Sequence, residues 1–580
     1  MTRPGTLFIS LLLVVAAAWL LLLGLPGRRD RHAEFGLPAL LHSRSAASLL
    51  GIGSPGNGDP ELLARAARAA VSLESALVQF AFDAPSAGHL ARTAARLLEP
   101  TLVVPESDPP AVSRGLGLRP VAALGEHGRE LLRLSERNLD RWPEAARREL
   151  SVLIETQNGI SRLLLEQSAA RGGEAARRAA ADRVIDRIRS GRLRDKTEGG
   201  TDLELAALCD GFERRVLLES WITLSDRLDR FLPILQRELT PAVVRAMKPL
   251  PEGGGVPRDL LVLARIEAGL LLIGGVHTTV LPQNGAALTI DLGGDDRWVG
   301  GVSIAGAAFL EPLTRVCIDL SGNDRYEGRG GQLAACTAGL SMLLDLQGDD
   351  TYESDGPEFG AALFGAAVLI DRGGRDSYRC RVAGLGFGLC GVGLLFDAGE
   401  DDRYQTECAG LGCGLGGGAG VLVDHWGDDL YLALGQETGE PGGTSGGAVL
   451  GAGYPLSPGQ LAGSGLLLDR RGSDVYRAGN GCLGSAEGGG LGCALDGGGD
   501  DLYSSGDDSL GSGKEGGFGY FRDLDGDDEY LSRNRTLGFG AAGVGLFIDD
   551  LGHDRFLCLP PSQGVGIRGG AGLHADLGGH

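Results

Sequence analysis

The sequence has few aromatic and few basic residues. Aromatic side chains make up 5% of the 580 residues, and 54 Lys and Arg stand against 76 Asp and Glu, which gives a net charge of −22. Because nucleic-acid binding requires a basic surface, we expect no nucleic-acid partner. The 98 glycines follow no Gly-X-Y period, which excludes collagen. A hydrophobic content of 43% excludes a wholly disordered chain.

Two common functional motifs are missing as well. The chain has no glycine loop followed by Lys and Ser or Thr for binding phosphates, and no Cys-x-x-Cys pair. Nine of the ten cysteines lie in the C-terminal half without a fixed register. We interpret them as small core residues, although an exported protein permits bridges such as Cys380–Cys408 or Cys408–Cys413.

A long apolar run lies near the N-terminus. Residues 7–25 are almost entirely apolar, and Arg28, Arg29 and Arg31 follow them. This length nearly spans a bilayer core and exceeds the apolar region of a cleavable signal, so we expect a signal-anchor over residues 1–30 rather than a signal peptide. The arginines after the apolar run favour a cytoplasmic location for the chain that follows it, whereas the acidic repeats favour export of that chain. We expect a cell-membrane protein on the extracytoplasmic face (periplasmic or cell-surface), secreted if the segment is cleaved.

Residues 33–270 have the pattern of helices joined by loops. Asp59, Pro60 and Glu61 form a typical helix start, and apolar residues recur every three or four positions after them. This stretch is predicted to be an all-α region that packs on the rest of the chain or binds a partner.

The C-terminal half consists of one repeat. The unit Asp-x-x-Gly-x-Asp-x-aromatic recurs in ten copies between Asp291 and Phe556, with Glu400 in place of the Gly in the fifth, and an eleventh copy begins at Asp576. Successive first Asp residues are 26 to 28 residues apart, except for one interval of 45, and the aromatic residue is Tyr in eight copies. Residues 281–580 hold 72 of the glycines and carry 43 acids against 18 bases. Such periodicity indicates a repeat architecture.

The residues between the turns predict β-strands. Small and apolar residues alternate there, and this glycine density is incompatible with helices. We therefore predict a parallel β-solenoid of about ten to eleven coils over residues 281–580, with an inserted loop at 435–463, a stacked aromatic column and an Asp ridge. The complete chain is predicted to be an α+β multidomain protein with an N-terminal anchor, an all-α region and the solenoid.

The strand before each first Asp is apolar on both faces, as in Val368, Leu369 and Ile370. A strand with one solvated face would alternate with polar residues. We therefore expect this sheet to be covered on its outer face, either by the helical region or by another copy of the chain in a homo-oligomer.

The turns resemble the calcium-binding nonapeptides of RTX-type (haemolysin-type) repeats, Gly-Gly-x-Gly-x-Asp-x-apolar. The eight residues of each turn are numbered as places one to eight, starting from the first Asp. The Gly at place four, the Asp at place six and the large apolar residue at place eight coincide with the nonapeptide over the turns of residues 291–556. The resemblance implies a structural Ca²⁺ bound by the second Asp of each repeat. The implied ligands are Asp296, Asp324, Asp350, Asp376, Asp402, Asp429, Asp474, Asp501, Asp528 and Asp554.

The charges of the repeated Asp residues independently raise the question of a bound cation. Carboxylates stacked at coil spacing repel by about 3–4 kcal/mol at an effective dielectric of 20, and oxygen-rich surroundings suit calcium better than zinc. The alternative is that each Asp caps its own turn through backbone N–H groups and binds no metal.

Together these features favour a membrane-tethered, extracytoplasmic structural or binding protein without catalysis, with a protein or glycan partner. One alternative is a polysaccharide-active β-helix enzyme, by analogy of fold. It would require an asymmetric cluster of acids with Arg or Lys near the 435–463 loop. The other alternative is a partner-binding scaffold without metal.

Overall fold

The computed structural model describes residues 86–98, 116–170, 214–252, 255–300, 313–329, 331–433, 450–455 and 462–578, with isolated residues in 179–186, 302–304 and 436–445. The expected signal-anchor at 1–30 and most of the inserted loop at 435–463 lie outside these residues. Among the helices of the described part, none is long and apolar enough to cross a membrane.

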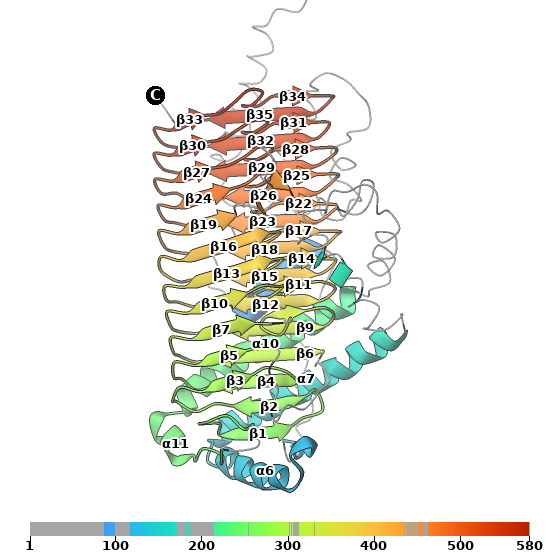
Figure 1. Ribbon diagram of the computed structural model, residues 1–580, viewed down its shortest axis with the longest axis vertical. Coiled ribbons are helices and arrows are strands. Elements are labelled where there is room, and N and C mark those ends of the chain that lie inside the picture. The colour runs from blue at the N-terminus through green and yellow to red at the C-terminus, as the bar shows by residue number, and fades with distance from the viewer. Residues whose placement is uncertain are drawn as a thin grey trace, which may run out of the picture.

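The C-terminal half winds into a parallel β-solenoid, as predicted, and the solenoid has three sheets (Figure 1). The first sheet contains the strands that lead into the first Asp of each repeat; all its neighbours are parallel except β1 and β2. Its strands are β1 (Val262–Arg265), β2 (Leu270–Ile273), β4 (Ala286–Asp291), β6 (Thr314–Asp319), β9 (Leu340–Leu344), β12 (Ala366–Ile370), β15 (Val392–Phe396), β18 (Ala419–Val423), β23 (Ser464–Leu468), β26 (Leu491–Leu495), β29 (Phe518–Asp523), β32 (Val544–Asp549) and β35 (Ala571–Asp576).

The second sheet starts directly after the second Asp of each repeat. Its register places each repeat aromatic beside the next, as in Tyr352 opposite Tyr378. Its strands are β3 (Val280–Pro282), β5 (Arg297–Val299), β7 (Arg325–Gly328), β10 (Thr351–Ser354), β13 (Ser377–Val382), β16 (Arg403–Cys408), β19 (Leu430–Ala433), β24 (Val475–Ala478), β27 (Leu502–Ser504), β30 (Glu529–Leu531) and β33 (Arg555–Leu557).

The third sheet consists of two-residue strands that lie directly against the first sheet. A Cβ on Gly388 would overlap the carbonyl oxygen of Ala419, so the two backbones approach closely here, although Ala362 and Ala486 occupy the same register position in other coils. The strands are β8 (Ala335–Cys336), β11 (Ala361–Ala362), β14 (Gly388–Leu389), β17 (Gly414–Leu415), β22 (Gly453–Tyr454), β25 (Ala486–Glu487), β28 (Gly513–Lys514), β31 (Gly540–Ala541) and β34 (Gly566–Ile567). A short antiparallel pair, β20 (Gln436–Glu437) and β21 (Thr444–Ser445), lies in the inserted segment.

Nine coils contribute a strand to all three sheets, whereas the repeat count predicts ten to eleven. The difference arises at the two ends. The first repeat supplies β4 and β5, and most of the residues after it lie outside the described part, while the last described coil stops at β35 in the first sheet. Among the described residues, the complete coils are therefore fewer than the turns.

The described part of the N-terminal region is helical. It contains α5 (Ala87–Leu98), α6 (Gly125–Leu139), α7 (Glu144–Ala170), α10 (Arg214–Glu238) and α11 (Pro241–Ala246), with a single 3₁₀ turn, η1 (Ala122–Leu124), before α6. The first sheet begins at β1, before the boundary of 281 that the repeats alone indicate, because β1 and β2 lack the Asp motif that defines the repeat.

Helices α5, α7 and α10 pack on the outer face of the first sheet. Trp221 and Leu224 of α10 share one buried cluster with Met342, Val368 and Ile370 of the sheet. Gln157 of α7 donates hydrogen bonds from Nε2 to the carbonyl oxygens of Ala287 (2.5 Å) and Thr314 (3.1 Å). The expected cover of this apolar face is thus, at β6, β12 and β15, the helical region of the same chain.

One end of the solenoid is closed by α6 and β1 (Figure 1). Leu131 of α6 belongs to the interior cluster that contains Trp298 and the tyrosines. Asn138 of α6 donates from Nδ2 to the carbonyl oxygens of Lys248 (2.7 Å) and Leu261 (2.8 Å), and its Oδ1 accepts the Lys248 N–H (3.1 Å). These bonds fix the helix across the first coil.

Candidate cation site in the buried aspartate column

The first Asp of each repeat lies at the corner between the first and second sheets. All ten of these residues are buried, and most are completely inaccessible to solvent. In nine of the ten repeats one carboxylate oxygen accepts the N–H of the residue two positions later, as Asp371 Oδ1 does from Gly373 (3.1 Å). This is the Asx turn that Asp favours where a chain reverses direction.

The tyrosine hydroxyls occupy the other oxygen of these carboxylates. Tyr352 donates to Asp371 Oδ2 at 2.6 Å, and Tyr476 donates to both Asp469 (3.1 Å) and Asp496 (2.7 Å), which belong to successive coils. The aromatic residue at place eight is therefore Tyr because its hydroxyl satisfies buried carboxylates, in addition to its ring packing.

The second Asp residues form a continuous hydrogen-bond ladder. The N–H of each second Asp donates to Oδ1 of the second Asp in the following coil, as from Asp350 to Asp376 and from Asp376 to Asp402, both 2.6 Å. The same bond recurs from Asp296 to Asp554. Each second Asp thus caps the turn of the preceding coil, and the interpretation that it caps its own turn is wrong for this residue.

The glycine at place four allows this close stacking. Gly348 has φ of 158° at the edge of the left-handed region, and a Cβ there would overlap the carbonyl oxygen of Gly322 in the preceding coil. Glu400 occupies this place in the fifth repeat, and the ladder bonds from Asp376 to Asp402 and from Asp402 to Asp429 are still formed there, so glycine is favoured at this place but is not required by the ladder.

The remaining oxygens of the second Asp residues face the first Asp residues. Among the described residues, no hydrogen-bond donor reaches eight of these buried Oδ2 atoms. They belong to Asp296, Asp324, Asp350, Asp376, Asp429, Asp474, Asp528 and Asp554.

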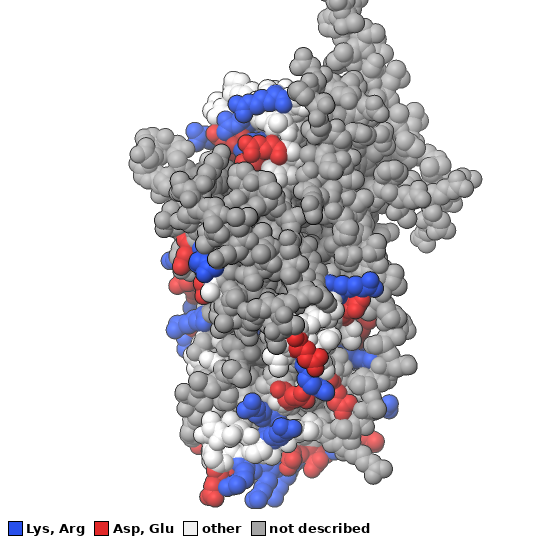
Figure 2. Space-filling view, turned by 90° about the vertical axis from the view of Figure 1, so that its right-hand side faces the viewer, with Lys and Arg blue, Asp and Glu red and all other residues white. Residues whose placement is uncertain are grey.

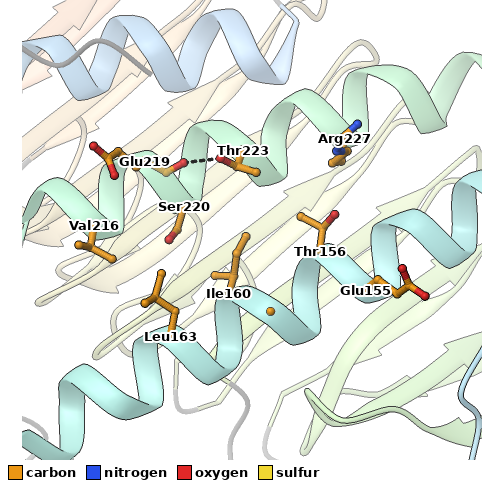
Figure 3. A pocket seen from close by; sticks show the side chains of 10 residues that line it. Glu155, Thr156, Ile160, Leu163, Val216, Glu219, Ser220, Thr223 and Arg227 are labelled. Carbon is orange, nitrogen blue, oxygen red and sulfur yellow. Dashed lines mark hydrogen bonds between the residues drawn. The ribbon is translucent and has the colours of Figure 1, made fainter. Parts of the chain in front are cut away.

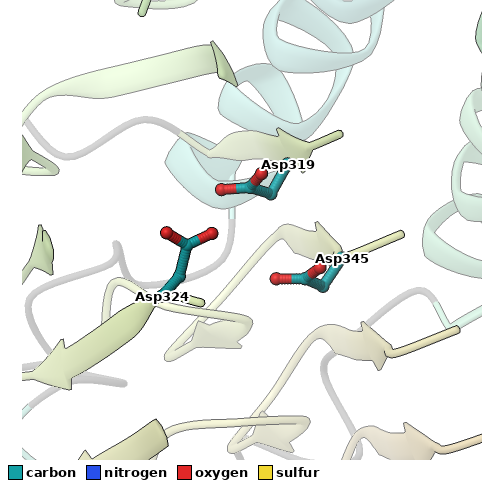
Figure 4. Close-up of side chains that lie close together, drawn as sticks. All are labelled: Asp319, Asp324 and Asp345. Atoms are coloured by element: carbon teal, nitrogen blue, oxygen red, sulfur yellow. The ribbon is translucent and has the colours of Figure 1, made fainter. Parts of the chain in front are cut away.

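Four of these residues lie in triads of carboxyl groups, namely Asp324, Asp350, Asp376 and Asp429. Asp319, Asp324 and Asp345 each place an oxygen within 4.8 Å of the other two, and their carboxyl groups point toward one another (Figure 4). The same combination of first Asp, second Asp and next first Asp recurs along the rod. The sequence identified the second Asp of each triad and missed the first, although the first Asp is equally regular in the repeat.

Burial disfavours negative charge on the stacked first and second Asp residues, which together form the Asp column. Burial, as the largest cause, raises the pKa of Asp350 to about 9 and that of Asp376 to about 10, and neighbouring aspartates such as Asp371 add to both shifts. The negative charge of the column must therefore be neutralised, either by protons or by a cation. All the atoms that the triads offer to a metal ion are carboxylate oxygens, which are the ligands that hard divalent cations prefer.

A separate row of side chains lines the outside of the same turns at place five. Asp349 is exposed, and its Oδ1 accepts the N–H of Arg375 at 3.0 Å. Asn323 fills the same place one coil earlier and accepts the N–H of Asp349 at 3.0 Å. An amide therefore serves in this outer row as well as a carboxylate does.

One asymmetric charged cluster lies beside β22, close to the inserted segment. Lys514 Nζ is 3.0 Å from Asp508 and 3.3 Å from Glu487, and Arg535 Nε is 2.6 Å from Asp508. The nearby cations lower the pKa of the Asp508 carboxyl despite its burial. This is the arrangement of a mutually neutralised ion-pair network rather than of a general acid, which requires a raised pKa.

A groove of about 460 Å³ lies between α7 and α10 (Figure 3). It is lined by apolar side chains such as Ile160 and Leu163 and by the polar side chains of Thr223 and Glu219, and the Thr223 hydroxyl is engaged with the Glu219 carbonyl oxygen (2.8 Å). On the described part of the face in Figure 2, basic and acidic side chains are interspersed rather than separated by sign. Neither feature provides a metal-ligand set like that of the Asp triads.

The cysteines in the described part are mostly reduced. Eight are free thiols, including Cys380, Cys408 and Cys413, so the bridges suggested by their spacing are wrong. Cys390 is disulfide-bonded.

No protein-family model, curated protein or solved structure matches the chain.

Proposed function

We propose that the chain is an extracytoplasmic structural protein, tethered to the membrane by residues 1–30, whose solenoid is a rigid rod stabilised by calcium. The observation that carries this proposal is the buried Asp triad repeated along the coils, with one carboxylate oxygen that no donor reaches. A protein or glycan partner would bind to the outer surface of such a rod.

Charge balance supports a divalent cation. Each coil contributes two buried carboxylates, so one Ca²⁺ per coil neutralises the column completely. Without it, neighbouring carboxylates at coil spacing repel by about 3–4 kcal/mol at an effective dielectric of 20. Three carboxyl groups from two coils form each triad, so a bound cation also ties each coil to the next.

The extracytoplasmic location rests on two observations. Residues 7–25 form the apolar run described above. The disulfide at Cys390 fits an oxidising compartment, where such bonds persist. Free calcium is also plentiful outside the cell, which suits a protein that requires it for stability.

A structural role is favoured over the polysaccharide-active alternative because the buried acids are evenly repeated. The triads recur in successive coils, whereas catalysis needs one local set of groups with different protonation states. The asymmetric cluster at Lys514 is internally paired, and it therefore lacks the free general acid that glycoside cleavage requires.

The proposal is tested on the full chain by thermal unfolding in calcium and in chelator. We expect a large rise in the unfolding temperature when calcium replaces the chelator. Terbium, which takes calcium sites, should luminesce when the protein is excited in its tyrosine band, because the tyrosine hydroxyls donate directly to the ligand carboxylates. Identical unfolding in chelator and calcium, together with absent terbium luminescence, would overturn the calcium-stabilised rod.

A further inference from the structure

One coil carries an exposed tryptophan on the outside of its turn. Trp426, at place three of the sixth repeat, is 43% exposed, whereas the other tryptophans of the described residues, Trp142, Trp221 and Trp298, are buried. The first five repeats have glycine, serine or glutamine at this place. The solenoid therefore does not require an aromatic ring there.

The turn uses only the backbone of this residue. The N–H of Trp426 donates to Oδ1 of Asp424 at 3.0 Å, and Gly373 makes the same bond to Asp371 at 3.1 Å without any side chain. The indole is thus available for a contact outside the fold, which is the usual meaning of a large apolar side chain displayed on a surface.

Two arginines of the following coil lie over the indole. The guanidinium carbons of Arg470 and Arg471 are 5.0 and 5.3 Å from the ring centroid of Trp426, within the range of cation–π attraction. Arg471 is exposed, and within the described part of the chain no carboxylate forms an ion pair with it. An aromatic ring and an accessible positive charge therefore lie side by side.

The same ridge of the rod carries a further basic residue. Arg372, at place two of the fourth repeat, is exposed, and Ala398 and Gly399 occupy places two and three of the coil that separates it from Trp426. The strands leading into these turns are stacked in register. From Arg372 to Arg471 the ridge rises by three coils, roughly 14 Å at coil spacing. We call these residues the Trp426 ridge.

A row of acids borders the Trp426 ridge. Asp401 and Asp428, at place five of the fifth and sixth repeats, are exposed, and the whole chain carries a net charge of −22. This row repels an anion, whereas Arg372 and Arg471 attract one. Charge complementarity therefore confines an anionic ligand to places two and three.

We propose that the Trp426 ridge binds the uronic-acid rings of an acidic polysaccharide. The C–H face of a pyranose ring stacks on the indole, and the carboxylate of that ring or of the next accepts two N–H bonds from the Arg471 guanidinium. A rigid, flat indole suits a rigid sugar ring better than a flexible acidic peptide, because less conformational freedom is lost on binding.

This inference deepens the proposed function and rests on it, because it gives the extracytoplasmic rod a class of partner. An extended chain of pyranose rings rises per ring by about one coil spacing. A four-ring segment therefore matches the length of the Trp426 ridge, and its carboxylates reach both Arg372 and Arg471.

The test titrates the full chain, in calcium, with tetragalacturonate, and the heat of adding the ligand to buffer is subtracted. We expect calorimetric binding and a change in tryptophan fluorescence. Trp426→Ala and Arg471→Gln should each weaken binding by about tenfold or more, as expected for a central Trp or Arg contact. Arg477→Gln removes the same charge from the exposed surface of β24 in the same coil and should leave the affinity unchanged.

Two further ligands separate the sugar from its charge. The methyl ester of tetragalacturonate keeps the rings and loses the carboxylates, and polyglutamate keeps the carboxylates without rings. We expect both to bind at least about tenfold more weakly than tetragalacturonate, since each lacks one of the two contacts. Equal binding of either ligand, no binding of tetragalacturonate, or unchanged affinity in Trp426→Ala would overturn the proposal.

Thermal unfolding distinguishes this proposal from that of the calcium-stabilised rod. Trp426→Ala introduces a small side chain where Gly373 and Gly399 already form the turn, and it lies outside the Asp triads. It should therefore fold and gain as much stability from calcium as the parent. A parent that calcium stabilises but that binds no tetragalacturonate overturns the glycan site alone, whereas tetragalacturonate binding without calcium stabilisation overturns the calcium-stabilised rod alone.

Discussion

At the residue scale, the two Asp residues of each repeat have different tasks. The first Asp accepts a turn N–H and a tyrosine hydroxyl, whereas the second Asp caps the preceding coil and leaves one oxygen open to the triad. The residue at place five, such as Asp349, is also negatively charged, but it is exposed. This contrast allows the buried charge to be tested against a matched surface charge.

We predict opposite responses to Asp350→Asn in chelator and in calcium. The amide keeps the oxygen that accepts the Asp324 N–H, but it replaces a carboxyl group that the folded triad with Asp345 and Asp371 must keep protonated or bound to a cation. The variant should therefore unfold at a higher temperature than the parent in chelator, and it should gain less from calcium. Titration calorimetry should count fewer bound ions.

Asp349→Asn is the control, because Asn323 already serves in the equivalent place. It should leave both the ion count and the unfolding temperatures unchanged. If the two variants behave alike, the buried triad is not where the cation binds.

Glycine supplies a second prediction at this scale. Gly388→Ala should destabilise the protein, because the new methyl group would overlap the Ala419 carbonyl oxygen between two sheets. Gly159→Ala, at an exposed position of α7 with no atom within 4 Å of the new methyl group, should stabilise the protein by roughly 0.5–1 kcal/mol. Chemical denaturation compares them, and equal effects would show that the two sheets separate readily.

The sequence revealed the second Asp residues but not the complete triad. The repeat made Asp350 and its equivalents visible, and the resemblance to calcium-binding repeats gave them a role. The first Asp has glycine in its place in that resemblance, so nothing assigned it to the same site. Burial of both carboxyl groups follows only from the three-sided closure of the coil, which brings residues 26 or 27 positions apart into contact.

At the scale of the elements, composition predicted the strands and their cover well. Val368 and Ile370 pack with the helices, whereas Leu369 packs with the buried tyrosines of the repeats inside the solenoid. This explains why three successive apolar residues precede an Asp. The third sheet was not predicted as a separate sheet. Its two-residue strands are too short to produce a periodic pattern, and their glycines indicate only a close approach of backbones.

Asn138 of the capping helix α6 makes three hydrogen bonds to the backbone of the first coil. We predict that Asn138→Ala destabilises the protein by about 1–3 kcal/mol for each buried backbone group left without a partner. Glu136→Ala, on the exposed face of the same helix, should change stability by no more than about 0.5 kcal/mol. Unfolding midpoints in denaturant measure both. A neutral Asn138→Ala would mean that hydrophobic contacts, such as that of Leu131, hold the cap.

At the scale of the whole molecule, the Asp column couples stability to pH and calcium together. The ordinary pKa of 3.8 applies to the unfolded carboxyl, whereas that of folded Asp350 is raised to about 9. The folded column therefore holds more protons between these values. That proton-linked stability is complete below the unfolded pKa and is lost as pH rises through the folded pKa.

We accordingly expect the chelated protein to unfold at a higher temperature near pH 5 than near pH 8. Calcium competes with the same protons, so its stabilising effect should grow over this range. Thermal unfolding at both pH values, with and without calcium, gives the four unfolding temperatures that test this expectation. A chelated protein that becomes more stable as pH rises would contradict a buried, proton-holding column.

The Asp ladder also has a direction. Each coil offers an N–H that only the carboxylate of the following coil accepts, and each tyrosine contacting two coils reaches forward in the same sense. On the ribosome, the helices and β1 are synthesised before the repeats, and every new coil supplies the carboxylate that the N–H of the preceding coil needs. We therefore expect the rod to assemble in the order of translation.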